Sequence, residues 1–361
     1  MTKRVAVAMS GGVDSSVTAG LLKEKGFDVI GITLRLWEED PTCAPVNNIH
    51  ACCSLSSVDD AKEVAAVLGI PHYTLDFRDI FRKDVIDYFI HSYQQGLTPN
   101  PCIACNKFIK FGLLWEKAKQ FGADFLATGH YARVIYDEKR QVYSLLRGAD
   151  RRKDQSYVLY QLTQDILPHM LFPMADLEKQ HTRELAKAWN LPVFNKPESQ
   201  DICFIPDNDY KGFLRKEIPQ YFKPGDFVDM HGKVVGKHKG IPCYTIGQRR
   251  GLNLGGPGGP YFVTAIDVKH NRVIVGGAQD LLSTTVHAKE ASWVEGVRTE
   301  PFKALGKIRY AAPESPCTVY PDGDTMRVEF EEPQRAVTGG QALVLYNPED
   351  GERVLGGGVI V

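Results

Sequence analysis

The chain has 361 residues, of which 43% are hydrophobic and 24% are charged. At roughly 150 residues per domain, this length predicts two or three domains, each with enough apolar residues for a core. The 43 basic and 44 acidic residues leave a formal charge of −1, so net charge alone does not indicate a nucleic-acid partner. No apolar run approaches the roughly 18 residues of a membrane span, and the first apolar run, at 5–8, has no room to be the apolar region of a signal peptide followed by a cleavage site. Eight cysteines are too few for a disulfide scaffold, so we expect a cytoplasmic protein with reduced thiols and no membrane partner.

Residues 1–205 alternate short apolar runs with longer amphipathic segments, which predicts an α/β fold with a Rossmann-like parallel sheet. The expected strands, buried on both faces, are 5–8, 29–34, 73–77 and 125–128. The expected helices are 13–25, 57–68, 80–95 and 108–121. Ligands of such folds bind outside the carboxyl ends of the strands.

After about residue 206, Gly, Pro and Asp separate short β-branched runs such as 261–268, 272–275 and 342–346. This pattern predicts β-rich structure. We place domain boundaries near 206 and 279, which divides the chain into 1–205, 206–278 and 279–361.

Basic residues are concentrated in the middle of the chain, although the total charge is balanced. Residues 230–266 contain no Asp or Glu and carry five cations, Lys233, Lys237, Lys239, Arg249 and Arg250. This segment is suited to a polyanion through phosphate contacts, and a solvated basic surface is the alternative.

The first expected strand leads into the string AMSGGVDSS at 8–16. Glycines allow close approach of the backbone to a ligand, and the N–H groups that begin the next helix attract an anion. The lysine of a Walker loop and the spacing of a dinucleotide fingerprint are both missing. A turn that needs glycine only for its geometry is the alternative. The full string resembles the pyrophosphate loop of the N-type ATP pyrophosphatases, which adenylate a substrate and release pyrophosphate; Asp14 would help to hold Mg2+ there.

Thiols occur in two further segments. Cys102 and Cys105 follow two prolines, and Cys105 directly precedes an expected helix with Lys107 close by, so we expect a lowered pKa and a nucleophilic thiol. Cys203 follows a polar stretch at 198–201. Two thiols on separate segments near an ATP site indicate sulfur chemistry.

Five motifs in order carry a closer resemblance: the string at 8–16, NPCIACNK at 100–107, ATGHYAR at 127–133, KDQSY at 153–157 and SQDIC at 199–203. Together they are similar to one family, the tRNA-specific 2-thiouridylases, which thiolate the wobble uridine of certain tRNAs. The resemblance implies a catalytic domain of the adenine nucleotide alpha hydrolase type, a small β-rich central domain that binds tRNA, and a C-terminal β-barrel.

The resemblance also implies a role for individual residues. Cys105 is the expected nucleophile and Cys203 the expected persulfide carrier. The residues expected to bind ATP are Ala8, Met9, Ser10, Gly11, Gly12, Val13, Asp14, Ser15, Leu34 and Gly129. Asn100, Pro101 and Cys102 are expected to face the target base, and His130, Lys153, Asp154, Gln155, Arg309, Tyr310 and Gln341 to contact tRNA.

The family pattern is broken at Cys102, where many members have aspartate. A thiol cannot replace that carboxyl as an acid or base, because its ordinary pKa is about 8.5 rather than about 3.9. Cys102, Cys105 and Cys203 together could also ligate a [4Fe-4S] cluster, and a zinc site with a fourth ligand is a further alternative. We favour persulfide chemistry.

The predicted reaction uses ATP and Mg2+ to adenylate the C2 oxygen of the wobble uridine. A persulfide on Cys203, loaded by a cysteine desulfurase or a sulfur-carrier protein, then supplies the sulfur and leaves a Cys105–Cys203 disulfide. The tRNA is expected to bind through its anticodon arm. Another ATP ligase with this loop and a non-catalytic RNA-binding protein are the rival interpretations.

Overall fold

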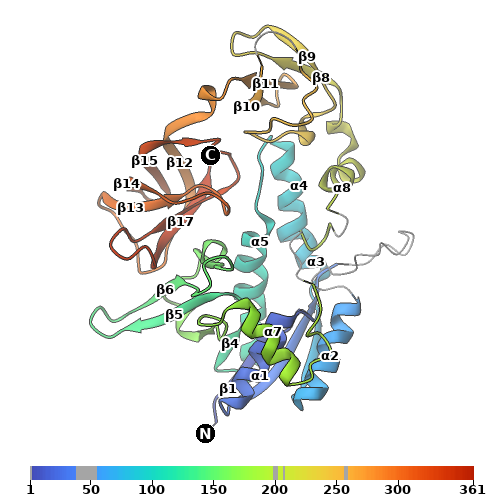
Figure 1. Cartoon of the computed structure of the whole chain (residues 1–361), viewed down its shortest axis with the longest axis vertical. Helices are drawn as coiled ribbons and strands as arrows, with labels where there is room; N and C mark the ends of the chain where they lie inside the picture. Colours follow the sequence, from blue (N-terminus) through green and yellow to red (C-terminus); the bar gives the residue numbers. More distant parts are fainter. Residues whose placement is uncertain (1, 38–54, 198–201, 206–207, 256–258) are drawn as a thin grey trace.

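The computed structural model describes residues 2–37, 55–197, 202–205, 208–255 and 259–361. Three β-structures follow one another along the chain: a five-stranded sheet, a four-stranded sheet and a closed six-stranded barrel (Figure 1). This order confirms the predicted fold class. In the described part of the chain, no helix is long and apolar enough to cross a membrane.

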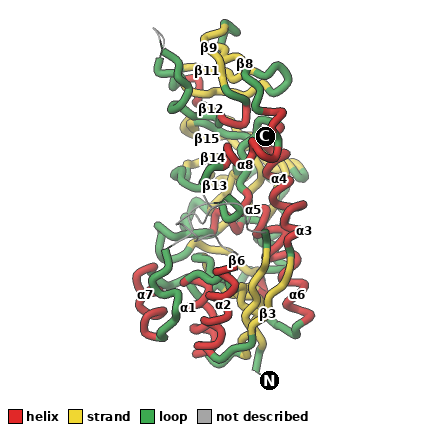
Figure 2. The backbone as a smooth tube through the Cα atoms, turned by 90° about the vertical axis from the view of Figure 1, so that its right-hand side faces the viewer, coloured by secondary structure: helices red, strands yellow, loops and turns green. Residues whose placement is uncertain are grey.

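The N-terminal sheet is parallel, with strand order β3-β2-β1-β4-β7. Its strands are β1 (Arg4–Ala8), β2 (Asp28–Arg35), β3 (His72–Asp76), β4 (Phe125–Ala127) and β7 (Met170–Leu171). Side chains alternate along β1: Val5 and Val7 pack under helices α1 (Val13–Glu24), α2 (Leu55–Leu68) and α7 (Lys179–Ala188), whereas Ala6 faces a second helical layer. Figure 2 shows helices on both sides of this sheet. Because these strands are parallel, the carboxyl ends of β1, β2 and β4 lie at one edge of the sheet.

Two sequence-based expectations for this domain are wrong in detail. Strand β3 is not buried on both faces, because it is the edge strand of the sheet, and Tyr73 is 41% exposed. The helix expected at 108–121 begins at Pro101, because the Asn100 side chain caps it by accepting a hydrogen bond from the Cys102 backbone N–H at 3.1 Å.

Both long helical stretches of the second layer contain a π-helical segment. The first consists of α3 (Arg78–Phe81), the π-helical Arg82–Ile86 and α4 (Asp87–Gln94). The second consists of α5 (Pro101–Ala104), the π-helical Cys105–Leu113 and α6 (Leu114–Gln120). π-Helical turns are frequent at functional sites, and here one starts at Cys105.

The remaining elements form the central sheet, the barrel and a hairpin. Helix α8 (Tyr210–Glu217) precedes the central sheet, which has the order β10-β11-β8-β9. Its strands are β8 (Gly225–Val228), β9 (Val234–His238), β10 (Phe262–Asp267) and β11 (Arg272–Gly276). The barrel strands are β12 (Leu282–Trp293), β13 (Phe302–Lys307), β14 (Ser315–Asp322), β15 (Thr325–Arg335), β16 (Ala342–Tyr346) and β17 (Val354–Ile360). The hairpin is β5 (Ala132–Asp137) with β6 (Val142–Arg147).

The barrel is docked firmly onto the catalytic domain. One apolar core runs from the second helical layer through Tyr157 and Tyr160 to Val344 and Tyr346 of the barrel. An ion pair between Arg140 and Glu295 adds a polar contact at the hairpin. The boundaries at 206 and 279 remain predictions, and the first and third predicted domains share a core although the second lies between them in the sequence.

Candidate active site

The loop at 8–16 joins β1 to α1 at the carboxyl edge of the sheet. The Ser10 backbone N–H donates to Ser15 Oγ at 3.2 Å, and Ser15 Oγ donates to the Gly12 carbonyl at 3.1 Å. Gly11 has φ +67°, in the left-handed region that favours glycine. The loop therefore turns sharply and begins α1 with its backbone N–H groups directed at the space beyond the sheet, as an anion site requires.

A methyl group at Gly11 would disrupt this loop. An added Cβ would lie 2.1 Å from the backbone oxygen of Ser57, which α2 holds in place. We expect Gly11→Ala to displace the loop and to weaken ATP binding by about tenfold or more, which titration calorimetry can measure. Gly26→Ala is the matched control, because Gly26 has φ +81° but open space around it. Equal ATP affinity in the two variants would contradict this role for the loop.

Two later segments lie at the same edge of the sheet as the loop. Gly129, just after β4, approaches α1 so closely that an added Cβ would lie 2.8 Å from the Ser15 backbone nitrogen. Leu34, near the end of β2, is buried in the core of the second helical layer. Both residues therefore lie at the same edge of the sheet as the loop, where the family resemblance predicts ATP.

Two lysines from distant parts of the chain contact the loop, and neither was predicted. Lys179, the first residue of α7, places Nζ 2.6 Å from Asp14 Oδ1, and the Tyr131 hydroxyl donates to the same oxygen at 3.0 Å. Lys196 places Nζ 3.0 Å from the Gly11 carbonyl and 2.5 Å from Asp60 Oδ2. They lie 165 and 185 residues after their partners in the loop, so no local sequence pattern could show them.

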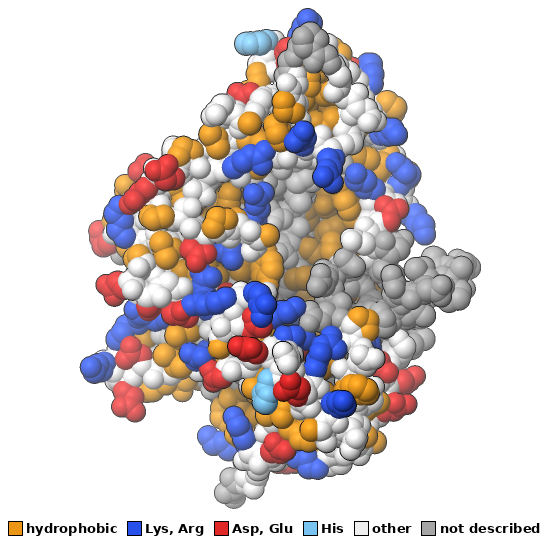
Figure 3. All heavy atoms as spheres, viewed as in Figure 1, with side chains coloured by type: hydrophobic (Ala, Val, Ile, Leu, Met, Phe, Trp, Pro, Cys, Tyr) orange, Lys and Arg blue, Asp and Glu red, His pale blue; other side chains and the backbone are white. Residues whose placement is uncertain are grey.

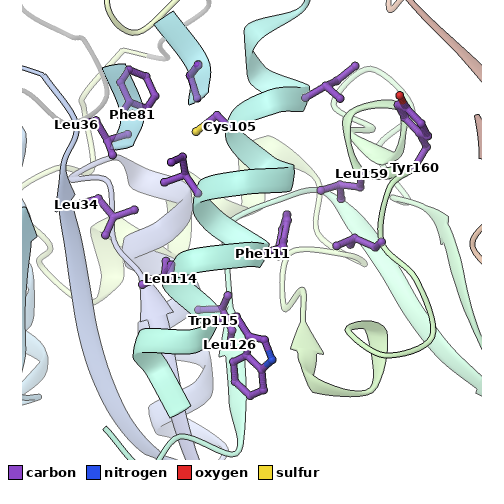
Figure 4. Close-up of a cluster of buried hydrophobic side chains, with 14 of the residues drawn as sticks. Leu34, Leu36, Phe81, Cys105, Phe111, Leu114, Trp115, Leu126, Leu159 and Tyr160 are labelled. Carbon is purple, nitrogen blue, oxygen red and sulfur yellow. The ribbon is translucent and has the colours of Figure 1, made fainter. Parts of the chain in front are cut away.

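Cys102 and Cys105 occupy different environments on one helix. Cys102 lies in the first turn and is exposed, whereas Cys105 is only 7% exposed. The expectation that Cys105 sits at a helix N-terminus is therefore wrong: the helix begins four residues earlier, at Pro101. Figure 4 shows the Cys105 sulfur pointing toward Leu36 and Phe81, beyond the carboxyl end of β2. The thiol thus lies at the same edge of the sheet as the phosphate loop.

Cys203 packs on the same core. Its neighbour Phe204 is buried, with its ring centre 5.8 Å from that of Phe81 and 5.4 Å from that of Phe89. Cys203 itself is partly buried against the core cluster that contains Cys105. Both thiol segments therefore pack against the α3–α4 helices. The polar stretch 198–201, and Cys43, Cys52 and Cys53, lie outside the described residues.

The described residues do not offer a metal-binding cluster. Among them, no group of three His, Cys, Asp or Glu side chains is placed to hold a metal ion. Cys102, Cys105 and Cys203 therefore do not form the ligand set that a [4Fe-4S] cluster or a zinc ion would need in this arrangement. Mg2+ that is bound together with ATP phosphates needs fewer ligands from the protein, and one carboxylate such as that of Asp14 is sufficient.

Comparison with known proteins identifies the family. Three family profiles match in order: a tRNA methyl transferase HUP domain at residues 3–207, a tRNA methyl transferase PRC-barrel domain at 211–277 and an aminomethyltransferase beta-barrel domain at 283–360. The tRNA-specific 2-thiouridylase MnmA of Carboxydothermus hydrogenoformans is 50% identical over 362 residues, which cover 99% of this chain and 97% of the relative. The proteins of the same name from Moorella thermoacetica and Clostridioides difficile are 50% identical over 356 residues and 48% identical over 362. These two alignments span 98% of the length of each relative, and they span 98% and 100% of this chain, respectively.

The chain belongs to the tRNA-specific 2-thiouridylase family. The family predicted from the five motifs is confirmed. The methyl transferase wording of two profiles does not alter this, because full-length relatives at half identity specify the family more closely than a domain description does.

Some residues that the family resemblance assigned to tRNA lie inside the protein. The His130 ring is buried, with Nδ1 2.7 Å from Thr128 Oγ1, and burial lowers its pKa well below the usual value. Asp154 is buried and accepts hydrogen bonds from the backbone N–H groups of Gly148 and Ser156. These placements support internal roles for His130 and Asp154 rather than direct tRNA contact.

The other residues assigned to tRNA lie nearer the surface. Arg309 and Tyr310 are exposed, and the Tyr310 hydroxyl donates to the Asp154 carbonyl at 2.9 Å. Lys153 is partly exposed, and Gln155 accepts a hydrogen bond from the Tyr131 backbone N–H. Gln341 Nε2 donates to the Thr98 carbonyl at 2.7 Å, just before Asn100 and Pro101. The barrel thus contacts the segment that leads into the helical stretch 101–120, which carries Cys102 and Cys105 and is called the thiol helix below.

A basic groove of about 430 Å³ lies where α8 meets the central sheet. Its charged walls come from Lys211 and Arg215 of α8 and from Lys237 and Lys239 on the sheet side, together with Asp209. Figure 3 shows Lys and Arg side chains gathered over the upper and central part of this face. The sequence indicated the sheet-side lysines but not the contribution of α8.

Proposed function

We propose that this chain is a tRNA-uridine 2-sulfurtransferase that uses ATP to replace the C2 oxygen of the wobble uridine with sulfur. The observation that carries the proposal is the position of Cys105, a thiol at the same edge of the parallel sheet as the phosphate loop. The names of the full-length relatives support the same reaction. An ATP ligase that forms amides would not need a thiol in this position.

The first step activates a poor electrophile. The C2 oxygen of uridine attacks the α-phosphorus of ATP, pyrophosphate leaves, and the base carries AMP on that oxygen. The α1 N-terminus, Ser10 and Ser15 are suited to hold the phosphates. Asp14 would hold Mg2+, which neutralises phosphate charge when it is bound. The tRNA base must leave its stack to reach this site, as for other enzymes that modify bases.

The second step transfers sulfur. The terminal sulfur of a Cys203 persulfide attacks C2, AMP leaves, and the Cys105 thiolate attacks the Cys203 sulfur to release the thiolated base. Alternatively, Cys105 first releases hydrosulfide, which then attacks C2. Either route ends in a Cys105–Cys203 disulfide that an external thiol reductant must reopen. A cysteine desulfurase or a sulfur-carrier protein would reload Cys203, and such partners fit the proposed cytoplasmic location.

The most direct test measures both products. The purified chain is incubated with ATP, Mg2+, unmodified tRNA and a persulfide donor, and AMP and 2-thiouridine are quantified by chromatography and mass spectrometry. We expect AMP only when tRNA is present, and 2-thiouridine only when the sulfur donor is also present. AMP formation without tRNA would instead support a different ligase, and no AMP at all would support a non-catalytic RNA-binding protein.

The basic groove is the surface we assign to the tRNA backbone. Replacing Lys211, Arg215 and Lys239 by alanine removes three candidate phosphate contacts. We expect tRNA affinity to fall about tenfold or more, and the slope of log affinity against log salt to decrease by about two to three. Filter binding at several salt concentrations measures both quantities.

A matched control removes the same charge elsewhere. Lys3, Lys25 and Lys119 lie close in sequence to the amino ends of β1, β2 and β4, the opposite edge of the catalytic sheet. Their triple alanine variant is expected to retain the wild-type salt slope. If both triple variants change the slope equally, the groove is not the tRNA surface.

A further inference from the structure

The phosphate loop lacks the lysine that a Walker loop provides, yet the fold brings a lysine to it. Lys179 starts α7, which packs beside α1 (Figure 1), and its side chain is only 13% exposed. Its ammonium lies 2.6 Å from Asp14 Oδ1 in the first turn of α1 and 5.8 Å from the centre of the Tyr131 ring. The charge is therefore held at the point where the loop enters the helix.

This location is unfavourable for a cation unless an anion is present. The N-termini of α1 and α7 both carry partial positive charge, which disfavours a lysine in their first turns. Asp14 compensates the ammonium of Lys179, and Asp150 Oδ2 accepts a hydrogen bond from the Lys179 backbone N–H at 3.4 Å. A polyphosphate bound at the α1 N-terminus would bring further negative charge within reach of Lys179.

Lys196 has a different arrangement. Its three N–H groups meet three acceptors: the Gly11 carbonyl at 3.0 Å, Ser57 Oγ at 3.4 Å and Asp60 Oδ2 at 2.5 Å. Because the peptide bond is trans, holding the Gly11 carbonyl makes the next N–H, that of Gly12, face away from Lys196. Lys196 therefore acts on the backbone of the loop, not on a ligand.

We propose that Lys179 binds the β- and γ-phosphates of ATP, as a Walker lysine would, and that Lys196 is a positioning residue that fixes the loop. In the free protein Asp14 holds the Lys179 ammonium in place, and the phosphate oxygens take it over when ATP binds. The inference rests on the proposed function for the ATP site itself and adds the residue that supplies the charge. Phosphate recognition in this loop then combines helix N–H groups from α1 with a cation from α7.

The experiment compares ligands with and without phosphate on the full-length chain. Affinities of wild type and Lys179→Met for ATP, inorganic pyrophosphate and adenosine are measured by calorimetry. Loss of a charge-assisted contact should weaken ATP and pyrophosphate by about tenfold to a hundredfold and leave adenosine unchanged. Lys179→Arg should recover part of the pyrophosphate affinity, which a lost packing contact would not explain.

Two further variants separate the alternatives. Lys187→Met removes an exposed charge from the last turn of the same helix and should bind all three ligands as wild type does. Lys196→Met should lower thermal stability in the absence of ligand, because it leaves Asp60 and the Gly11 carbonyl without the ammonium. Unchanged pyrophosphate affinity in Lys179→Met, with ATP bound normally by wild type, would overturn this inference alone. Failure of wild type to bind ATP would instead overturn the proposed function.

Discussion

Replacement of either Cys105 or Cys203 by serine is expected to abolish 2-thiouridine formation, by about a thousandfold or more. A serine at 203 cannot carry a persulfide, and a serine at 105 cannot attack one at neutral pH, because a hydroxyl is not ionised there. Neither change removes a basic residue from the groove, so tRNA affinity should stay close to that of wild type. Nucleoside mass spectrometry measures the product, and filter binding measures the affinity.

Two other cysteines make this test specific. Cys317 is fully buried in the barrel, where burial raises its pKa to about 12, so Cys317→Ala should retain activity and serves as the control. Cys102→Ser distinguishes the chemical alternatives: under persulfide transfer it should retain measurable activity, because the two working thiols remain. If Cys102→Ser abolishes 2-thiouridine formation as completely as Cys105→Ser does, the result would favour a site that needs all three thiols. Full activity of Cys105→Ser or Cys203→Ser would refute the assigned roles.

The sequence predicted what is encoded locally. The strand–loop–helix at 8–16 and the strand boundaries near 29–34 and 125–128 depend on residues adjacent in the chain, and the structure places them within two residues. Lys179 and Lys196 could not be predicted, because only the packing of α7 and of the segment after it brings them to the loop. These two lysines are therefore brought to the site by the tertiary fold.

Burial was the other property that motifs did not reveal. Lys153, Asp154 and Gln155 of the string KDQSY at 153–157 were expected to contact tRNA, yet Asp154 and Ser156 lie in the joint between catalytic domain and barrel. The helix was expected to begin only after Cys105, whereas Pro101 is the first residue of a capped helix. At 153–157 long-range contacts with the barrel decide the burial, whereas at Pro101 the adjacent Asn100 cap decides where the helix begins.

The joint itself contains a buried cation, Arg147 of the β5–β6 hairpin. It is 7% exposed and stacks on the Tyr346 ring, with its guanidinium carbon 3.9 Å from the ring centre. Nη2 lies 3.0 Å from Glu314 Oε1 and Nη1 3.8 Å from Asp154 Oδ2. Among the described residues, Nη2 and Nε make no well-aligned hydrogen bond, so charge and stacking hold the group more than hydrogen-bond geometry does. Arg147 thus links the hairpin, the 153–157 segment and the barrel.

Arg147→Met should lower the free energy of unfolding by about 3 to 5 kcal/mol, because it leaves the buried Asp154 carboxylate without its cation. Arg151→Met is the matched control: Arg151 pairs with Glu352 across the same joint but is 47% exposed, so we expect a loss below about 1 kcal/mol. Urea denaturation of both variants measures the difference. The loosened joint should also reduce thiolation, because Gln341 and the barrel contact the segment at Thr98 that leads into the thiol helix. If the two variants unfold at the same urea concentration, Arg147 does not hold the barrel on the catalytic domain, and the thiol helix must be positioned by its own domain alone.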